Sequence, residues 1–493
     1  MDQDSNEEAA ARQEVVVVVV PLPSQGHQNQ LFHFSRLIST HGIPVYYVGS
    51  AVHNHQVKTR MHGWNDFSDN SNFHFHDFPT PFYDLNQNEL PVSSDNTVSR
   101  HASNKFPLHL IESLFEVLIN LEEPISELLN SLSLIARRVV VVHDPLMAFV
   151  AKEASSIPNG DSYCFNVCSA FGLLYFKWVS LGCSYSIPNI QTLCEYLTAD
   201  DHLSKIDGSF PDAFLALIAS QMEFQQFDVG ELHNTCYPLE SKFIDLLGQE
   251  PFLAQDHRQW ALGPLNVVTV DSTESSESRH ECLVWLDSQP KNSVIYVAFG
   301  ATITLSHEEI MELATGLEHS EQRFIWVLRE TDRADAFVDG GEACNIELPE
   351  GYEERMEGIG MIVRDWAPQI EILAHPSTGG FLSHCGWNSC MESLTMGVPI
   401  AAWPMHSDQP WNTVLVTDVL KVGLVVKEWE SRSEVISSTM IESAVKKLMV
   451  SEDGHEMRER AEQLGVDVRS SVISEDGSSN AELNSFIAHI SRP

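Results

Sequence analysis

The chain has 493 residues, of which 43% are hydrophobic and 20% charged, so it is long enough for two or three domains with sizeable cores. Its 69 acidic and 29 basic residues give a formal net charge of -40. This charge repels phosphate backbones, which argues against nucleic acid as a partner. An anionic ligand must then be held by local dipoles rather than by the overall field.

The N-terminus predicts neither export nor membrane insertion. Residues 1–13 are acidic and lack the basic start and apolar run of a signal peptide, so we expect a disordered tail. The apolar run Val15–Val20 is far too short to span a membrane, and no later stretch is long enough. The cysteines form no CxxC pair, which favours a reduced protein in the cytoplasm.

The first half of the chain alternates apolar runs with amphipathic segments. EVVVVVVPLP, IPVYYVGS and RRVVVVHD predict buried strands, and the segment from His27 to Gly42 predicts a helix after the first of them. Runs that are apolar on both faces are typical of parallel strands covered by helices. This pattern predicts an α/β domain.

A polar break at residues 250–282 precedes the same alternation in the second half, beginning with SVIYVAFG. Two such halves joined by one linker would leave a cleft between them. The predicted divisions are a tail at 1–13, an N-terminal domain at 14–262, a C-terminal domain at 263–475, and a segment at 476–493 that packs back on the N-terminal domain.

One segment of the second half, from Trp366 to Gln409, concentrates polar, aromatic and glycine residues. In GGFLSHCGWNS a predicted strand ends at His384, Gly386 turns the chain, and a helix begins at Asn388. The free N–H groups at a helix N-terminus bind anions such as a diphosphate. An ordinary capped helix is the alternative interpretation.

The sequence contains no GxxxxGK, no HExxH and no GxSxG, so it predicts neither a P-loop NTPase nor a zinc peptidase nor a serine hydrolase with a nucleophile elbow. We expect no bound metal and no cofactor.

Between Trp366 and Gln409 the opening WAPQ, the central HCGWNS, then Glu392, GVP and the closing DQ stand in register with the signature box of plant family-1 UDP-glycosyltransferases. The chain resembles this family over nearly its whole length. The segment PLPSQGHQNQLFHFSRLISTHGIPVYYVGSAVHNHQ is most similar to the zeatin O-glucosyltransferase group. The resemblance implies the GT-B fold, with two facing doubly wound Rossmann-like domains, inversion at the anomeric carbon, and no metal.

The resemblance also implies how the co-substrate UDP-glucose binds. Trp366 would stack on the uracil, and the backbone of Ala367 would pair with its edge. Glu392 would accept hydrogen bonds from the ribose hydroxyls, with Gln369 nearby.

For the diphosphate, the resemblance implies contacts from His384, Asn388 and Ser389. A further phosphate contact in the family comes from a Ser or Thr just after the first strand of the C-terminal domain. Here Ala301 stands at that place, so Thr302 is the candidate.

For the sugar, the resemblance implies contacts from Trp387, Asp408 and Gln409. A closing Gln is associated with glucose, although bean relatives of the zeatin group can use UDP-xylose. The family's Thr that contacts the primary hydroxyl of the sugar is matched here by Val167, with Ser169 nearby.

His27 and Asp144 are the candidate catalytic residues. Both lie where a predicted strand ends, at the carboxyl edge where α/β proteins place their chemistry. An imidazole can take a proton from a hydroxyl near neutral pH, and a carboxylate can stabilise the resulting imidazolium. A lone His near a helix start is more often structural, but the family has a His–Asp dyad at these positions. His143 competes with Asp144, although strand alternation points it the other way.

These observations predict transfer of glucose from UDP-glucose to a hydroxyl of a small hydrophobic acceptor. A zeatin-type cytokinin is the first choice of acceptor, and a flavonoid, other phenolic or terpenoid is the alternative. Aromatic residues could line an apolar acceptor pocket or belong to the core; they are Trp64, Phe75, Phe78, Phe82 and Phe171.

Two alternatives come from other functional classes. One is an inactive small-molecule binding protein, against which the intact dyad and signature box argue. The other is a hydrolase that combines the dyad with a serine. For the enzyme itself we expect a cytoplasmic monomer without nucleic-acid or membrane partners.

Overall fold

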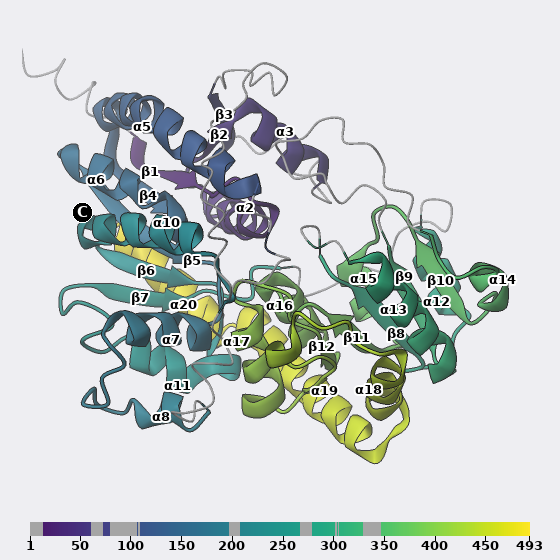
Figure 1. Cartoon of the computed structure of the whole chain (residues 1–493). Helices are drawn as coiled ribbons and strands as arrows, with labels where there is room; N and C mark the ends of the chain where they lie inside the picture. The colour runs from purple at the N-terminus through teal and green to yellow at the C-terminus, as the bar shows by residue number, and fades with distance from the viewer. Residues whose placement is uncertain are drawn as a thin grey trace, which may run out of the picture.

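The computed structural model describes residues 13–60, 72–78, 106, 109–196, 208–266, 279–300, 303, 305–328 and 347–493. Two parallel sheets, each covered by helices, form two layered halves (Figure 1). The tail expected at residues 1–13 lies outside the described residues except for its last member, which opens the first strand.

The first sheet has seven parallel strands in the order β3-β2-β1-β4-β5-β6-β7. Valines of β1 and β4 are fully buried because helices cover both faces of these central strands. The order reverses between β1 and β4, and such a switch point is where open α/β sheets bind ligands. The strands are β1 (Gln13–Val20), β2 (Val45–Ser50), β3 (Phe73–Phe78), β4 (Ala136–His143), β5 (Gly160–Asn166), β6 (Gly230–His233) and β7 (Arg258–Ala261).

The helices of the first half divide between the two faces of this sheet. Helices α5, α6 and α10 pack on one face, and α2 packs on the other. The helices are α2 (Gln25–Ser39), α3 (Ala51–Arg60), α5 (His109–Ile135), α6 (Phe149–Ser156), α7 (Ala170–Ser180), α8 (Gln191–Cys194), α10 (Asp212–Met222) and α11 (Tyr237–Leu247).

The second sheet has six parallel strands in the order β10-β9-β8-β11-β12-β13. They are β8 (Val294–Ala298), β9 (Arg323–Val327), β10 (Gly360–Val363), β11 (Thr378–Ser383), β12 (Ile400–Ala402) and β13 (Gly423–Val425). Helices α13 and α18 pack on one face, and α12 and α15 on the other. The helices of this half are α12 (Glu281–Asp287), α13 (His307–Ser320), α14 (Tyr352–Arg355), α15 (Gln369–Ala374), α16 (Trp387–Met396), α17 (Gln409–Val414), α18 (Ser438–Val450) and α19 (Glu452–Ile473).

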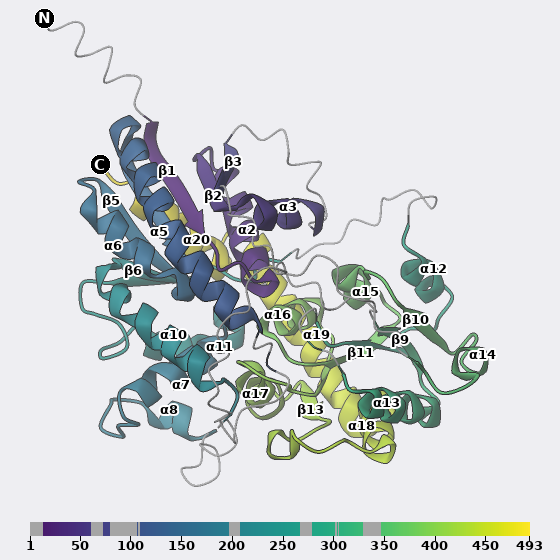
Figure 2. The same ribbon diagram turned by 45° about the horizontal axis from the view of Figure 1, so that its top comes forward.

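The chain crosses between the halves twice. It leaves the first half after β7, and it returns through α19 into the last helix, α20 (Ser478–Ile490), as the yellow helices in Figure 2 show. On α20 the fully buried Phe486 contacts the rings of Phe34, Tyr163 and Trp260, so the C-terminal helix packs on the face of the first sheet that α2 covers.

An apolar cluster joins the two halves. It includes α7 and α11 of the first half together with α16, α17 and α19 of the second. Trp411 of α17, for example, packs against Tyr175 and Phe176 of α7. This shared core fixes the distance between the two sheets' carboxyl edges. Within the described ranges, no helix is long and apolar enough to cross a membrane.

Candidate functional site

His27 and Asp144 meet at the switch point of the first sheet. His27 lies in the first turn of α2, which follows β1, and Asp144 directly follows β4. Because β1 and β4 are adjacent and parallel, their carboxyl ends bring the two side chains together. His27 Nδ1 lies 2.6 Å from Asp144 Oδ2. Asp144 is fully buried, whereas 27% of the His27 side chain is exposed.

This contact sets the chemistry of the imidazole. Burial lowers the pKa of His27, but the charge and hydrogen bond of Asp144, with a contribution from Asp408, raise it above the ordinary value of 6.5. Nδ1 donates to the carboxylate, so Nε2 is the nitrogen left to accept a proton. The Asp144 Oδ1 accepts the backbone N–H of Leu146 at 2.9 Å, which fixes the carboxylate. The pair can therefore act as a general base and its orienting carboxylate.

The N-terminus of α16 lies beside this pair. Asn388 Nδ2 donates to the carbonyl of Gly26, the residue before His27, at 2.8 Å. Trp387 Nε1 donates to the carbonyl of Asn234 at 2.8 Å, and its side chain is buried. Hence the indole of Trp387 points into the contact between the halves.

Two glycines leave room for the His384 ring next to this helix. A Cβ on Gly300, whose φ is +78°, would lie 2.9 Å from His384 Nε2, and a Cβ on Gly386 would lie 2.5 Å from it. Burial lowers the pKa of His384 to about 4, so the imidazole is neutral at pH 7. Its Nδ1 has no hydrogen-bond partner within the described part of the chain. A neutral imidazole carries one N–H, which can donate to a phosphate oxygen.

The residues predicted for the nucleoside gather on α15 and α16. Gln369 Nε2 donates to Glu392 Oε2 at 2.5 Å and to Ser389 Oγ at 3.1 Å. Burial raises the pKa of Glu392 to about 7, and hydrogen bonds from a ligand's hydroxyl groups would stabilise its charged form. Ala367 is buried, whereas Trp366 is 44% exposed and lies nearly perpendicular to the ring of His280. Trp366 can therefore offer a ring face to a flat ligand.

The residues predicted for the sugar lie at the start of α17. Asp408 is half-buried, and burial raises its pKa; its Oδ2 accepts a bond from Asn412 at 2.9 Å. Gln409 Oε1 accepts the backbone N–H groups of Met405 at 2.7 Å and His406 at 3.0 Å. The amide oxygen of Gln409 thus fixes its own loop, and its amide nitrogen makes a long contact of 3.5 Å with His406 Nδ1.

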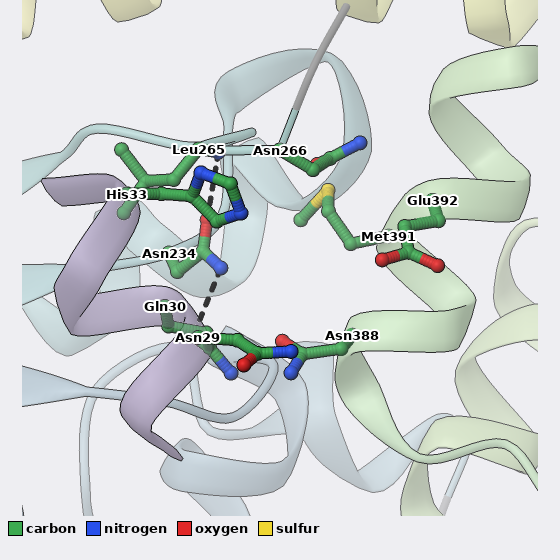
Figure 3. Close-up of a pocket in the computed structure, with 9 residues that line it drawn as sticks. All are labelled: Asn29, Gln30, His33, Asn234, Leu265, Asn266, Asn388, Met391 and Glu392. Carbon is green, nitrogen blue, oxygen red and sulfur yellow. Dashed lines mark hydrogen bonds between the residues drawn. The ribbon is translucent and has the colours of Figure 1, made fainter. Parts of the chain in front are cut away.

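A pocket opens between α2 and α16, with walls from both halves (Figure 3). Carboxamides dominate its lining, and such groups both donate and accept hydrogen bonds. Glu392 points into it from α16, opposite His33 of α2. The lining residues are Asn29, Gln30, His33, Asn234, Leu265, Asn266, Asn388, Met391 and Glu392.

Two polar residues near the site were missed from the sequence. Gln30 Nε2 donates to the Val167 carbonyl at 2.8 Å, and Asn234 Nδ2 donates to Gln30 Oε1 at 2.8 Å. Asn234 follows β6, so it lies at the same carboxyl edge as the dyad. The sequence signal that could have identified Asn234 is a polar residue directly after a strand. Ser169 instead caps α7 and donates to Asn412 of the second half at 2.9 Å.

The expected acceptor-lining aromatics divide into two groups. Phe78 and Phe171 are buried, and Phe75 packs against Phe32 and Tyr47, so these three belong to the core. Trp64 and Phe82 lie outside the described residues, as does Thr302. Among the residues that the structure describes, no group of three or more His, Cys, Asp or Glu could hold a metal ion.

Two family descriptions match consecutive parts of the chain. Residues 13–267 match the glycosyltransferase N-terminal domain, and residues 264–459 match UDP-glucoronosyl and UDP-glucosyl transferase. Among solved structures, UGT2 of Phytolacca americana complexed with UDP-2fluoro-glucose and pterostilbene superimposes with a TM-score of 0.73 at 25% identity, covering 97% of this chain and 99% of that one.

Two plant relatives align over 97% of this chain at 46% identity. They are a zeatin O-glucosyltransferase of Phaseolus lunatus, covered over 97% of its length, and a zeatin O-xylosyltransferase of Phaseolus vulgaris, covered over 98%. These matches and the two facing parallel-sheet halves confirm the resemblance and the GT-B fold predicted from the sequence. The chain belongs to the UDP-dependent glycosyltransferase family.

Proposed function

We propose that this enzyme transfers glucose from UDP-glucose to a hydroxyl of a zeatin-type cytokinin, with inversion at the anomeric carbon and without a metal. The observation that carries the proposal is the 2.6 Å contact between His27 and Asp144 beside the N-terminus of α16. The zeatin-type acceptor is supported by the names of the two relatives at 46% identity. Because those two differ in the sugar they transfer, the choice of glucose rests on Gln409 and the family resemblance.

In the proposed reaction, His27 Nε2 takes the proton of the acceptor hydroxyl. The oxygen attacks the anomeric carbon from the face opposite UDP, and the bond from that carbon to the diphosphate oxygen breaks. Asp144 stabilises the imidazolium that forms. The N–H groups that open α16, with Ser389, Asn388 and His384, stabilise the leaving diphosphate.

The same proposal assigns residues to the uracil, the ribose and the sugar of UDP-glucose. Trp366 stacks on the uracil, the backbone of Ala367 pairs with its edge, and Glu392 binds the ribose with Gln369 beside it. Asp408 and the amide nitrogen of Gln409 contact the sugar. At Trp387 the contact passes to the backbone, since the indole N–H is bonded to Asn234. Thr302 is the proposed additional phosphate contact.

We also propose that the enzyme acts as a monomer in the cytoplasm. All eight cysteines in the described residues are free thiols, which is typical of a reducing compartment.

The test is a mass-spectrometric screen of purified protein with UDP-glucose and UDP-xylose against trans-zeatin, cis-zeatin and a flavonoid panel. We expect a single-hexose adduct on zeatin with release of one UDP per product. Adducts on flavonoids alone would show that the acceptor is a flavonoid rather than a cytokinin. A xylose adduct alone would show that the donor is UDP-xylose rather than UDP-glucose. If no adduct forms although calorimetry shows UDP binding, the inactive binding protein becomes the better description.

A further inference from the structure

A second buried His–Asp pair adjoins the candidate dyad, because its histidine directly precedes Asp144 in the chain. His143, the last residue of β4, and Asp228, which precedes β6, are joined by a contact of 2.8 Å between His143 Nε2 and Asp228 Oδ1. The His143 side chain is fully buried and that of Asp228 is 3% exposed. The same Asp228 oxygen accepts the hydroxyl of Ser162 on β5 at 2.7 Å. The pair therefore joins three consecutive parts of the sheet.

Both ring nitrogens of His143 face acceptors. Nδ1 lies 2.8 Å from the backbone carbonyl oxygen of Asp144, and a carbonyl can only accept. Nε2 faces the Asp228 carboxylate. With Asp228 as a carboxylate, each nitrogen carries the proton of its bond, so the ring is held as an imidazolium paired with that carboxylate.

The surrounding charges agree with this protonation state. Burial lowers the pKa of His143, but the charges of Asp228 and Asp144 and their hydrogen bonds raise it above 6.5. On the neighbouring strand β5, burial raises the pKa of Cys164 well above its ordinary value, so that group stays a neutral thiol. On the other neighbouring strand, β1, the residue opposite His143 is Val20, which carries no charge.

The bond from His143 reaches the backbone of the residue that orients His27. Asp144 donates its own N–H to Val20 at 3.0 Å, and its carbonyl also accepts the N–H of Met147 at 2.8 Å. The N–H of Met147 closes the turn after β4, whereas His143 holds the same carbonyl from the side of the sheet. A shift of this peptide would move the Asp144 carboxylate relative to His27.

We propose that His143 is a positioning residue for the transfer reaction: as an imidazolium held by Asp228, it fixes the backbone at Asp144 and thereby the carboxylate that orients His27. This inference rests on the proposed role of the His27–Asp144 dyad. It gives a function to a histidine that touches neither donor nor acceptor. The two His–Asp pairs then have different roles: the His27–Asp144 pair accepts the proton, and the His143–Asp228 pair positions Asp144.

The test uses three variants that share Asp228→Asn, so that none leaves a carboxylate buried without a cation. D228N alone lets a neutral His143 keep its Nδ1–H bond to Asp144. H143L/D228N removes that bond, and H143N/D228N restores a donor, because the amide nitrogen of Asn lies near the place of His Nδ1. The readouts are kcat and KM with UDP-glucose, UDP affinity by calorimetry, and the His27 pKa by NMR of labelled histidine.

Relative to D228N, we expect H143L/D228N to lose about tenfold in kcat, since a small misplacement of a catalytic group carries such a cost. KM and UDP affinity should change less than about twofold, and the His27 pKa should fall. H143N/D228N should recover most of both losses. Equal kcat and equal His27 titration in D228N and H143L/D228N would overturn the proposal, and so would a loss in H143L/D228N that H143N/D228N does not reverse.

A measurement on the wild type covers the case in which D228N fails to fold. Nitrogen NMR of labelled histidine should show both His143 nitrogens protonated at pH 7.5, and one unprotonated nitrogen there would overturn the proposal. A wild type that transfers sugar to no acceptor would instead refute the proposed function. These NMR titrations need no turnover, so the two failures remain distinguishable.

Discussion

At the scale of single residues, the environment of His27 controls the proposed chemistry. Its ring remains partly exposed, so an acceptor hydroxyl can reach Nε2, while Nδ1 is bonded to a carboxylate that has no exposure of its own. A raised pKa makes His27 a stronger base but requires a higher pH to free it of its proton. The contact with Asp144 therefore lowers activity at acidic pH, where His27 is protonated, and makes His27 a stronger proton acceptor near neutral pH.

This balance predicts the pH profile. Since only neutral His27 can act as base, the acidic limb of kcat/KM should have its midpoint above pH 6.5. Asp144→Asn removes the charge that raises the His27 pKa, so its limb should move to lower pH while the maximal rate falls about a thousandfold or more. Steady-state kinetics from pH 5 to pH 9 measures both, with UDP affinity as the control for the donor site. An unmoved limb in Asp144→Asn would contradict this assignment.

Some site residues could be predicted from the sequence and others could not. His27 and Asp144 each follow a strand whose apolar run is plain, so the edge of the sheet could be assigned without knowing the strand order. Gln30 contacts Asn234, and His143 contacts Asp228, over separations of 204 and 85 residues. Those partners depend on the order of strands in space, which local patterns do not contain.

At the scale of elements, close packing between helices depends on particular glycines. Gly316 on α13 faces α18, where an added Cβ would lie 2.7 Å from Ile441 Cβ and 2.8 Å from the Ser438 carbonyl oxygen. The contact is with backbone and with a branched carbon near it, so neither can move aside easily. The α13–α18 pair in turn covers one face of the second sheet.

We therefore predict that Gly316→Ala lowers the free energy of unfolding by about 1–3 kcal/mol, although Ala favours helix more than Gly does. Thr315→Ala, at the adjacent half-buried position, is the control and should stay within about 0.5 kcal/mol of the wild type. Urea unfolding monitored by circular dichroism measures both. A Gly316→Ala variant as stable as the wild type would show that α13 and α18 separate readily.

Element positions were more predictable than their ends. The helix expected from His27 to Gly42 runs from Gln25 to Ser39, and in the apolar segment GVPIAAWP the strand β12 covers only Ile400–Ala402. The end of a strand depends on where its neighbour stops pairing, and β12 pairs β13 through only three residues. Local propensity cannot report that limit.

At the scale of the whole molecule, an anionic co-substrate must bind to a chain of formal net charge -40. The arrangement supplies local dipoles instead of a basic surface: the N-terminus of α16, neutral His384 and a carboxamide-lined pocket lie where the two halves meet. The shared apolar core beneath them keeps these groups opposite His27. Protonation of buried histidines would disturb this arrangement.

Stability should therefore fall steeply in mild acid. Burial lowers the pKa of His233 to about 4 and that of His406 to about 3, so the unfolded chain takes up these protons near pH 6.5 and the folded chain does not. Their contribution is complete above pH 6.5 and is lost as the pH falls toward 4, by ~1.4 kcal/mol per pH unit for each. His27 and His143 have raised pKa values, and their contributions are lost as the pH rises above 6.5.

Urea unfolding at pH 7, 6 and 5 measures this slope. His233→Gln removes one of the protons taken up on unfolding, so its slope between pH 6 and pH 5 should be smaller by ~1.4 kcal/mol per pH unit. A variant with the wild-type slope would mean that His233 is charged in the folded state.

The central claim is that His27 activates an acceptor hydroxyl for attack on a UDP-bound sugar held by the other half. The direct measurement compares wild type with His27→Ala, using UDP-glucose and trans-zeatin at saturating concentrations and mass spectrometry of the product. We predict a single-hexose product from the wild type and a loss of about a thousandfold or more in His27→Ala, with UDP affinity preserved. A His27→Ala enzyme that forms the same product at the wild-type rate would contradict the account.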